Sequence, residues 1–170
     1  MNLLLAFIIA MATTMALIPP LARSAGRLRV LDAPGVRKVH AQPMPRVGGI
    51  AMLAGVVLAL LLWLPAFDQR TLAWLAGVGI VFAFGVWDDR APLSPAAKLL
   101  GQLLAISCVV FVGGISIETF TLGQRHLLPV WVSVPVTFLF LLGATNAVNL
   151  ADGLDGLAGG MTLLSCGALG

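Results

Sequence analysis

Charged residues are scarce in this 170-residue sequence, where Asp, Glu, Lys and Arg together make up only 10% of the chain. Apolar residues make up 59%, and the mean hydropathy is +1.02. A soluble globular domain carries about 25% charged residues, so the composition excludes that class. We therefore predict an all-α integral membrane protein, a polytopic helix bundle with no nucleic-acid partner.

Cysteine is also rare, and Cys108 and Cys166 lie in apolar runs without the close spacing that a metal site needs. A basic leader is missing as well. The positive residues follow the first apolar run instead of preceding it, which is the wrong polarity for a cleaved secretory signal. The first run is therefore expected to remain as a membrane helix.

Long apolar runs recur along the chain, and each can cross about 30 Å of hydrocarbon. They predict about six spans, at residues 3–21, 48–65, 71–87, 96–113, 129–148 and 156–170. Because the last run is still apolar at Gly170, we expect a single membrane domain that is the N-terminal fragment of a longer protein. Between Ile115 and Leu128 the apolar period shortens toward two around Gly123, which predicts a small external β-hairpin.

Basic residues are distributed unevenly between the predicted loops. Six of the ten lie between Arg23 and Arg46, and cytoplasmic loops are enriched in Lys and Arg. We therefore expect residues 22–47, 88–95 and 149–155 to be cytoplasmic and the N-terminus to lie outside. This orientation leaves only Arg70 and Arg125 on the outer side.

Two amides and two carboxylates interrupt the apolar sequence near its end, at Asn146, Asn149, Asp152 and Asp155. On one straight helix, residues at this spacing would drift around the axis by about half a turn. Glycines in the same stretch can break the helix, so that the polar groups converge on a bend. The alternative is an ordinary solvated turn, which uses the same residue types.

A pair of carboxylates, Asp88 and Asp89, ends the third apolar run. Adjacent carboxylates repel each other, so a divalent ion that bridges to phosphates would favour keeping both. The alternative is a simple helix end at which Arg90 neutralises part of the charge. Ser94 can cap the next helix with Pro95 in its first turn, which would bring Lys98 close to the same membrane surface.

The basic segment between residues 23 and 47 is too rich in proline for a continuous helix, so we predict an extended loop. One interpretation is a basic loop attracted to anionic lipid. The other is that Arg37, Lys38 and Arg46 receive phosphate oxygens, while Gly48 and Gly49 allow a ligand to approach.

Together, these three elements resemble the polyprenyl-phosphate N-acetylhexosamine-1-phosphate transferases. The resemblance lies in Asp32-x-Pro34-x-x-Arg37-Lys38-x-His40-x-x-Pro43-x-Pro45-Arg46-x-Gly48-Gly49, Asp88-Asp89 and Asn149-x-x-Asp152-x-x-Asp155. The first motif looks most like the branch that uses UDP-N-acetylglucosamine. It looks less like the branch that transfers phospho-muramoyl-pentapeptide.

The resemblance implies a protein of about ten or eleven helices in the bacterial inner membrane, with a cytoplasmic active site. The implied reaction transfers a sugar-1-phosphate, N-acetylglucosamine-1-phosphate, from a UDP-sugar to a polyprenyl phosphate such as undecaprenyl phosphate. UMP is released, and a lipid-linked cell-envelope polysaccharide is started. The implied cofactor is Mg²⁺, with Mn²⁺ as the alternative, and a homodimer is compatible with the resemblance.

The resemblance also implies roles for individual residues. The catalytic residues would be Asp88, Asp89, Asp152 and Asp155, and the first two would also hold the metal. The substrate-binding residues would be Lys38, His40, Arg46 and Asn149. The family carries a further acidic loop and a histidine-rich loop that do not occur before Gly170, so the 170-residue chain alone is expected to be inactive. An ion-coupled membrane transporter with a broken-helix site is the alternative function, and a non-catalytic scaffold is the third.

Overall fold

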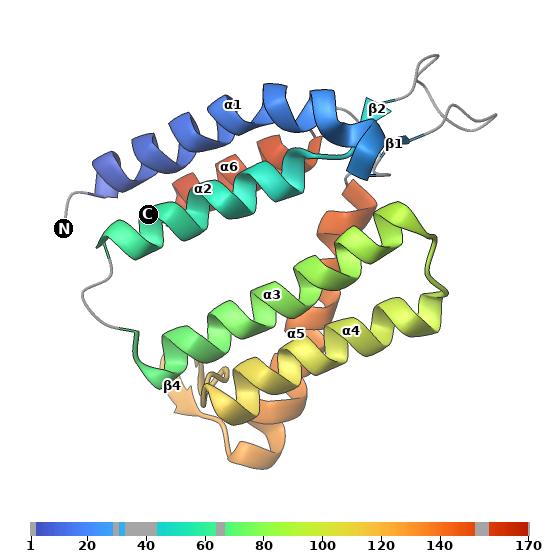
Figure 1. Cartoon of the computed structure of the whole chain (residues 1–170). Coiled ribbons are helices and arrows are strands. Elements are labelled where there is room, and N and C mark those ends of the chain that lie inside the picture. Colours follow the sequence, from blue (N-terminus) through green and yellow to red (C-terminus); the bar gives the residue numbers. More distant parts are fainter. Residues whose placement is uncertain (1–2, 29–30, 33–43, 64–66, 152–156, 170) are drawn as a thin grey trace. The chain divides into compact units, whose positions relative to one another are not determined.

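The computed structural model describes residues 3–28, 31–32, 44–63, 67–151 and 157–169 (Figure 1). Its helices are α1 (Leu3–Leu28), α2 (Gly48–Trp63), α3 (Gln69–Arg90), α4 (Pro95–Ser107), α5 (Val130–Ala151) and α6 (Leu157–Leu169). A π-helical turn, Cys108–Val112, follows α4 directly. The short strands are β1 (Leu31–Asp32), β2 (Met44–Pro45), β3 (Thr119–Leu122) and β4 (Gln124–Leu127).

Within the described part of the chain, four helices are long and apolar enough to cross a membrane. These are Leu4–Arg27, Gln69–Arg90, Pro95–Val112 and Val130–Ala151, and Gly48–Trp63 is a shorter apolar helix. Large apolar side chains such as Phe7, Leu139 and Leu164 are exposed on the helices, as expected where lipid takes the place of water. The protein is therefore a multi-pass membrane protein, and the predicted all-α class is confirmed.

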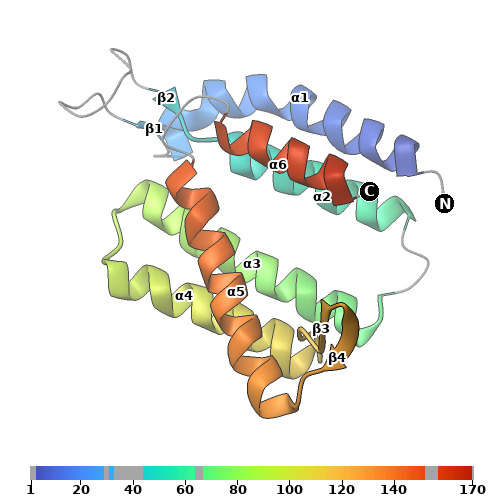
Figure 2. The same cartoon turned by 180° about the vertical axis from the view of Figure 1, so that it is seen from behind.

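The chain divides into two compact units, residues 1–68 with 79–98, and residues 69–78 with 99–170. In the first unit α1 and α2 lie side by side and antiparallel in both views (Figures 1 and 2). A Cβ added to Gly55 would lie only 2.5 Å from the Ala10 carbonyl oxygen and from Thr14 Oγ1. The Thr14 hydroxyl donates to the Ala10 carbonyl at 2.8 Å. The two helices therefore approach closely because Gly55 has no side chain.

In the second unit the first half of α3 packs through the small residues Ala73 and Gly77 against the end of α4 and the π-helical turn that follows it. A Cβ on Gly77 would lie 2.7 Å from Val109 Cγ2 and 3.2 Å from the Ala105 carbonyl oxygen. The Cys108 thiol donates to the carbonyl oxygen of Ala73 at 3.6 Å. Cys108 is therefore a packed thiol at a helix contact.

The predicted hairpin is present in the second unit, where β3 and β4 pair antiparallel with Leu122 opposite Gln124. Gly123 makes the turn with φ of +73°, a conformation that favours glycine. The Ile117 N–H before β3 donates to Thr137 Oγ1 on α5 at 2.8 Å. The hairpin is thereby fixed to α5.

Several helices extend beyond the apolar runs that predict the spans. Pro19 and Pro20 do not end α1, which continues to Leu28 and includes Arg23 and Arg27. In its last part, the fully buried Ala25 forms a buried cluster with Val47, and this contact stabilises the helix beyond the prolines. Of the predicted extended loop that follows, the structure describes strands β1 and β2, which pair antiparallel. Residues 29–30 and 33–43 lie outside the described residues.

Candidate active site

The two adjacent carboxylates lie in the last turn of α3 rather than in the loop expected at residues 88–95. Helical hydrogen bonding continues there, because the Ala91 N–H donates to the Trp87 carbonyl at 2.8 Å. A helix C-terminus carries partial negative charge, so Asp88 and Asp89 are disfavoured at this position unless cations compensate them. The structure supplies a cation to each.

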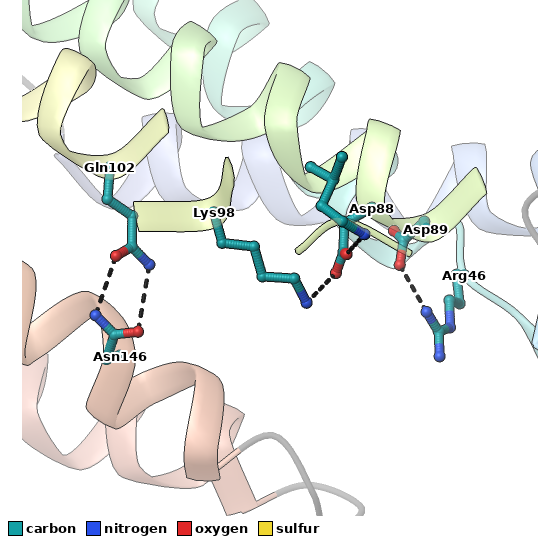
Figure 3. Close-up of polar contacts among 7 residues, drawn as sticks. Arg46, Asp88, Asp89, Lys98, Gln102 and Asn146 are labelled. Carbon is teal, nitrogen blue, oxygen red and sulfur yellow. Dashed lines mark hydrogen bonds and ion pairs between the residues drawn. The ribbon is translucent and has the colours of Figure 1, made fainter. Parts of the chain in front are cut away.

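Asp88 is held by the turn that connects α3 to α4. Its Oδ1 accepts the Leu93 N–H at 2.8 Å, and its Oδ2 lies 2.8 Å from Lys98 Nζ (Figure 3). Lys98 is placed there because α4 begins at Pro95, where Ser94 Oγ accepts the Ala97 N–H at 3.2 Å. The predicted Ser94 cap is confirmed, and Lys98 lies beside the acidic pair.

Asp89 has a different partner from Asp88, since consecutive residues on a helix point about 100° apart. Its Oδ1 lies 3.0 Å from Nη1 of Arg46, a residue 43 positions earlier in the chain (Figure 3). Arg46 directly precedes the buried Val47 and the start of α2, and this packing fixes its backbone. The structure therefore brings one predicted phosphate-binding residue to the predicted acidic pair.

Both ion pairs are partly open to solvent, with side-chain exposed fractions between 28% and 42%. Pairs with this exposure stabilise a fold by only about 0–1 kcal/mol, so an incoming cation or phosphate can displace either partner. Each carboxylate has about four acceptor positions, and carboxylate oxygens are the ligands that Mg²⁺ prefers. The pair therefore fits a hard divalent ion, although the described residues contain no group of three or more His, Cys, Asp or Glu close enough to hold one.

In the second unit the end of α5 carries Asn146 and Asn149, and both side chains are exposed. α5 continues to Ala151, so Asn149 is helical rather than part of the loop expected at residues 149–155. Asn146 faces Gln102 of α4, and the two amides form two hydrogen bonds (Figure 3). Sequence reasoning did not include Gln102, although an amide in an apolar helix is a signal that could have identified it.

Four predicted site residues, Lys38, His40, Asp152 and Asp155, lie outside the described residues. The glycines of the predicted bend, Gly153 and Gly156, lie outside them as well. Of the remaining four, Asp88, Asp89 and Arg46 meet in the first unit. Asn149 belongs to the second unit.

Comparison with known proteins gives a family match and several relatives for this chain. Residues 71–170 match glycosyl transferase family 4. The chain is 36% identical over 166 residues to a probable undecaprenyl-phosphate N-acetylglucosaminyl 1-phosphate transferase of Bacillus subtilis, covering 96% of this chain and 46% of the relative. It is 33% identical over 150 residues to the undecaprenyl-phosphate alpha-N-acetylglucosaminyl 1-phosphate transferase of Yersinia pestis, covering 85% and 40%.

A relative from the other branch is a phospho-N-acetylmuramoyl-pentapeptide-transferase of Methylacidiphilum infernorum. It is 32% identical over 139 residues, covering 70% of this chain and 37% of the relative. No solved structure matches the chain significantly. The chain spans less than half the length of these relatives.

Membrane helices with an acidic pair at a helix end occur in several classes of protein, so they do not identify one by themselves. The family match identifies one, because it covers more than half of the chain. The chain belongs to glycosyl transferase family 4. Its relatives include proteins named as polyprenyl-phosphate N-acetylglucosamine-1-phosphate transferases, the family that its motifs resemble. The alternative of an ion-coupled transporter has no support from these relatives.

Proposed function

We propose that the whole protein transfers N-acetylglucosamine-1-phosphate from UDP-N-acetylglucosamine to a polyprenyl phosphate and releases UMP. The observation that carries this proposal is the acidic pair Asp88–Asp89 at the end of an apolar helix, where each carboxylate meets a half-exposed cation. Relatives with this activity in their names cover most of the chain. The product would start a lipid-linked cell-envelope polysaccharide.

In the proposed reaction the lipid phosphate attacks the sugar-proximal phosphorus of the UDP-sugar. The bond from that phosphorus to the bridging oxygen breaks, and the oxygen leaves with UMP. One phosphoanhydride replaces another, so no further energy source is needed. The main barrier is repulsion between anionic reactants, and fixed positive groups lower it by holding the phosphates in line.

The acidic pair and the basic loop take complementary parts. Asp88 and Asp89 would hold the metal and accept the proton of the lipid phosphate. When bound, a magnesium ion, or manganese as the alternative, supplies positive charge against the phosphate oxygens. Lys38, His40 and Arg46 would contact phosphate oxygens, and Arg46 can do so by exchanging its half-exposed contact with Asp89 for a phosphate.

The second group of residues would bind the nucleotide. Asn149 lies on the exposed end of α5, where an amide can both donate to and accept from a uridine or ribose. Asp152 and Asp155 would follow near the reaction centre. By the positive-inside rule residues 22–47, 88–95 and 149–155 face the cytoplasm of a bacterium, where UDP-sugars are made. The N-terminus faces outward.

UMP formation by the full-length protein in membranes tests the proposal, with UDP-N-acetylglucosamine and undecaprenyl phosphate supplied. Asp89→Asn and Asp152→Asn are each expected to depress UMP release strongly without loss of membrane insertion. Glu118→Gln is the matched control, because its side chain is exposed and its backbone carbonyl makes the described contact with Leu128. Near-normal turnover in both Asn variants would remove the site assignment.

A further inference from the structure

The described part of α4 and α5 contains a two-point contact between amides that the proposed chemistry does not use. Asn146 Nδ2 donates to Gln102 Oε1 at 3.1 Å, and Gln102 Nε2 donates to Asn146 Oδ1 at 3.4 Å (Figure 3). Asn146 Nδ2 also donates to the Leu142 carbonyl oxygen at 2.8 Å. Each amide thus both donates and accepts across the helix contact, which fixes the orientation of both side chains.

Two amide side chains are energetically costly to place in membrane helices unless they are hydrogen-bonded. An amide transferred from water to hydrocarbon without a partner costs about 4–8 kcal/mol, and the cost falls when each amide satisfies the other. The surroundings on both helices are apolar: Leu99, Leu103 and Ile106 lie near Gln102 in α4, and Leu142 and Val148 lie near Asn146 in α5. Elsewhere in α4 the small residues Gly101 and Ala105 are buried, and the Ala105 carbonyl lies against Gly77 of α3, so helix packing alone does not require an amide.

The position of Asn146 shows what the pair can control. It lies one turn before Asn149 and five residues before Ala151, where α5 ends. A residue three positions further along a helix lies on the neighbouring part of the same face. The contact with Gln102 therefore fixes the rotation of α5 just before the turn that presents Asn149 and leads to Asp152.

We propose that Gln102 is a positioning residue that acts through Asn146 to orient the end of α5 for binding the nucleotide of the UDP-sugar. This inference rests on the proposed function. Neither amide contacts substrate in the proposal. Its consequence is specific: disrupting the pair weakens binding of the UDP-sugar and leaves binding of the lipid phosphate unchanged.

The test uses the full-length protein with the variants Gln102→Leu, Gln102→Asn, Asn146→Gln and the exchanged double variant Gln102→Asn/Asn146→Gln. The exchange restores both amides with the same total side-chain length, whereas Gln102→Asn and Asn146→Gln alone each change that length by one methylene. Gln102→Leu is expected to raise KM for the UDP-sugar about five- to tenfold, the loss expected for one or two hydrogen bonds. KM for the lipid phosphate should not change, and the double variant should recover most of the loss.

Gln69→Leu is the matched control. The Gln69 side chain also joins two elements of this unit, because its Nε2 donates to the Val112 carbonyl at 2.9 Å, but it lies at the first residue of α3. Its loss is expected to lower stability without changing KM for the UDP-sugar. A KM change of equal size in Gln69→Leu would mean that any lost helix contact has this effect, and the positioning role would be overturned.

A readout independent of turnover separates this inference from the proposed function. Amide hydrogen exchange in residues 146–151 is expected to accelerate in Gln102→Leu and to return toward wild type in the exchanged double variant. Unchanged exchange in Gln102→Leu, or a KM loss that the double variant does not recover, would overturn the inference. If the wild-type protein forms no UMP at all, the proposed function fails by itself, and hydrogen exchange still decides whether Gln102 holds the end of α5.

Discussion

Replacing Asp88 by asparagine separates the chemical role of this residue from its structural role. The asparagine Oδ1 can still accept the Leu93 N–H, whereas its amide group would face the Lys98 ammonium group with two donors opposed. The Asp88 and Lys98 side chains are 28% and 42% exposed, so losing their ion pair should cost folding no more than about 1 kcal/mol. Insertion and folding are therefore expected to be nearly normal.

Turnover should respond far more strongly than stability. Losing one preorganised electrostatic contact from a reaction centre costs about 2.7–4 kcal/mol of barrier, or about 100- to 1,000-fold in kcat. The assay is UMP release by the purified full-length protein with undecaprenyl phosphate and Mg²⁺, beside a thermal unfolding measurement. A variant that unfolds normally and retains more than about a third of the wild-type kcat would refute the assignment of Asp88 to the reaction centre.

Two further predictions concern topology and helix packing. Single cysteines at Gln42 and Gln124 should differ in labelling by an impermeant thiol reagent on intact cells, with position 124 labelled and position 42 protected; the reverse pattern would overturn the orientation. Gly55→Ala should destabilise the protein by about 1–3 kcal/mol, because the new Cβ would meet the Ala10 carbonyl oxygen at 2.5 Å. Gly79→Ala is its control, since nothing lies within 4 Å of a Cβ there, and equal melting temperatures in the two variants would contradict the packing described for α1 and α2.

The sequence predicts the fold class well because the hydrocarbon core of a membrane requires long apolar helices, and composition reports these directly. It predicts helix ends less well. An apolar run marks where lipid surrounds a helix, whereas backbone hydrogen bonds continue into the polar interface. Asp88 and Asn149 lie at the edges of apolar runs, and both are helical in the structure because the helices continue past those runs.

Local chemistry is also readable from sequence when neighbours in the chain determine it. The Ser94 cap and the Gly123 turn follow from residue types whose partners lie within four positions. In contrast, Arg46 meets Asp89 across 43 residues and Gln102 meets Asn146 across 44. Those contacts depend on which helix faces pack together, and the helices carry apolar residues on all sides, so hydrophobic periodicity does not indicate the packed face.

The identity of the released nucleotide tests the central claim most directly. The full-length protein should be incubated with UDP-N-acetylglucosamine labelled separately in the sugar and in the uridine, undecaprenyl phosphate and Mg²⁺, and the nucleotide and lipid products should be separated and counted. We predict equal amounts of UMP and of a lipid that carries the sugar through a diphosphate. Release of UDP, or labelled lipid with a single phosphate, would show that the sugar moves without its phosphate and would contradict the proposed reaction.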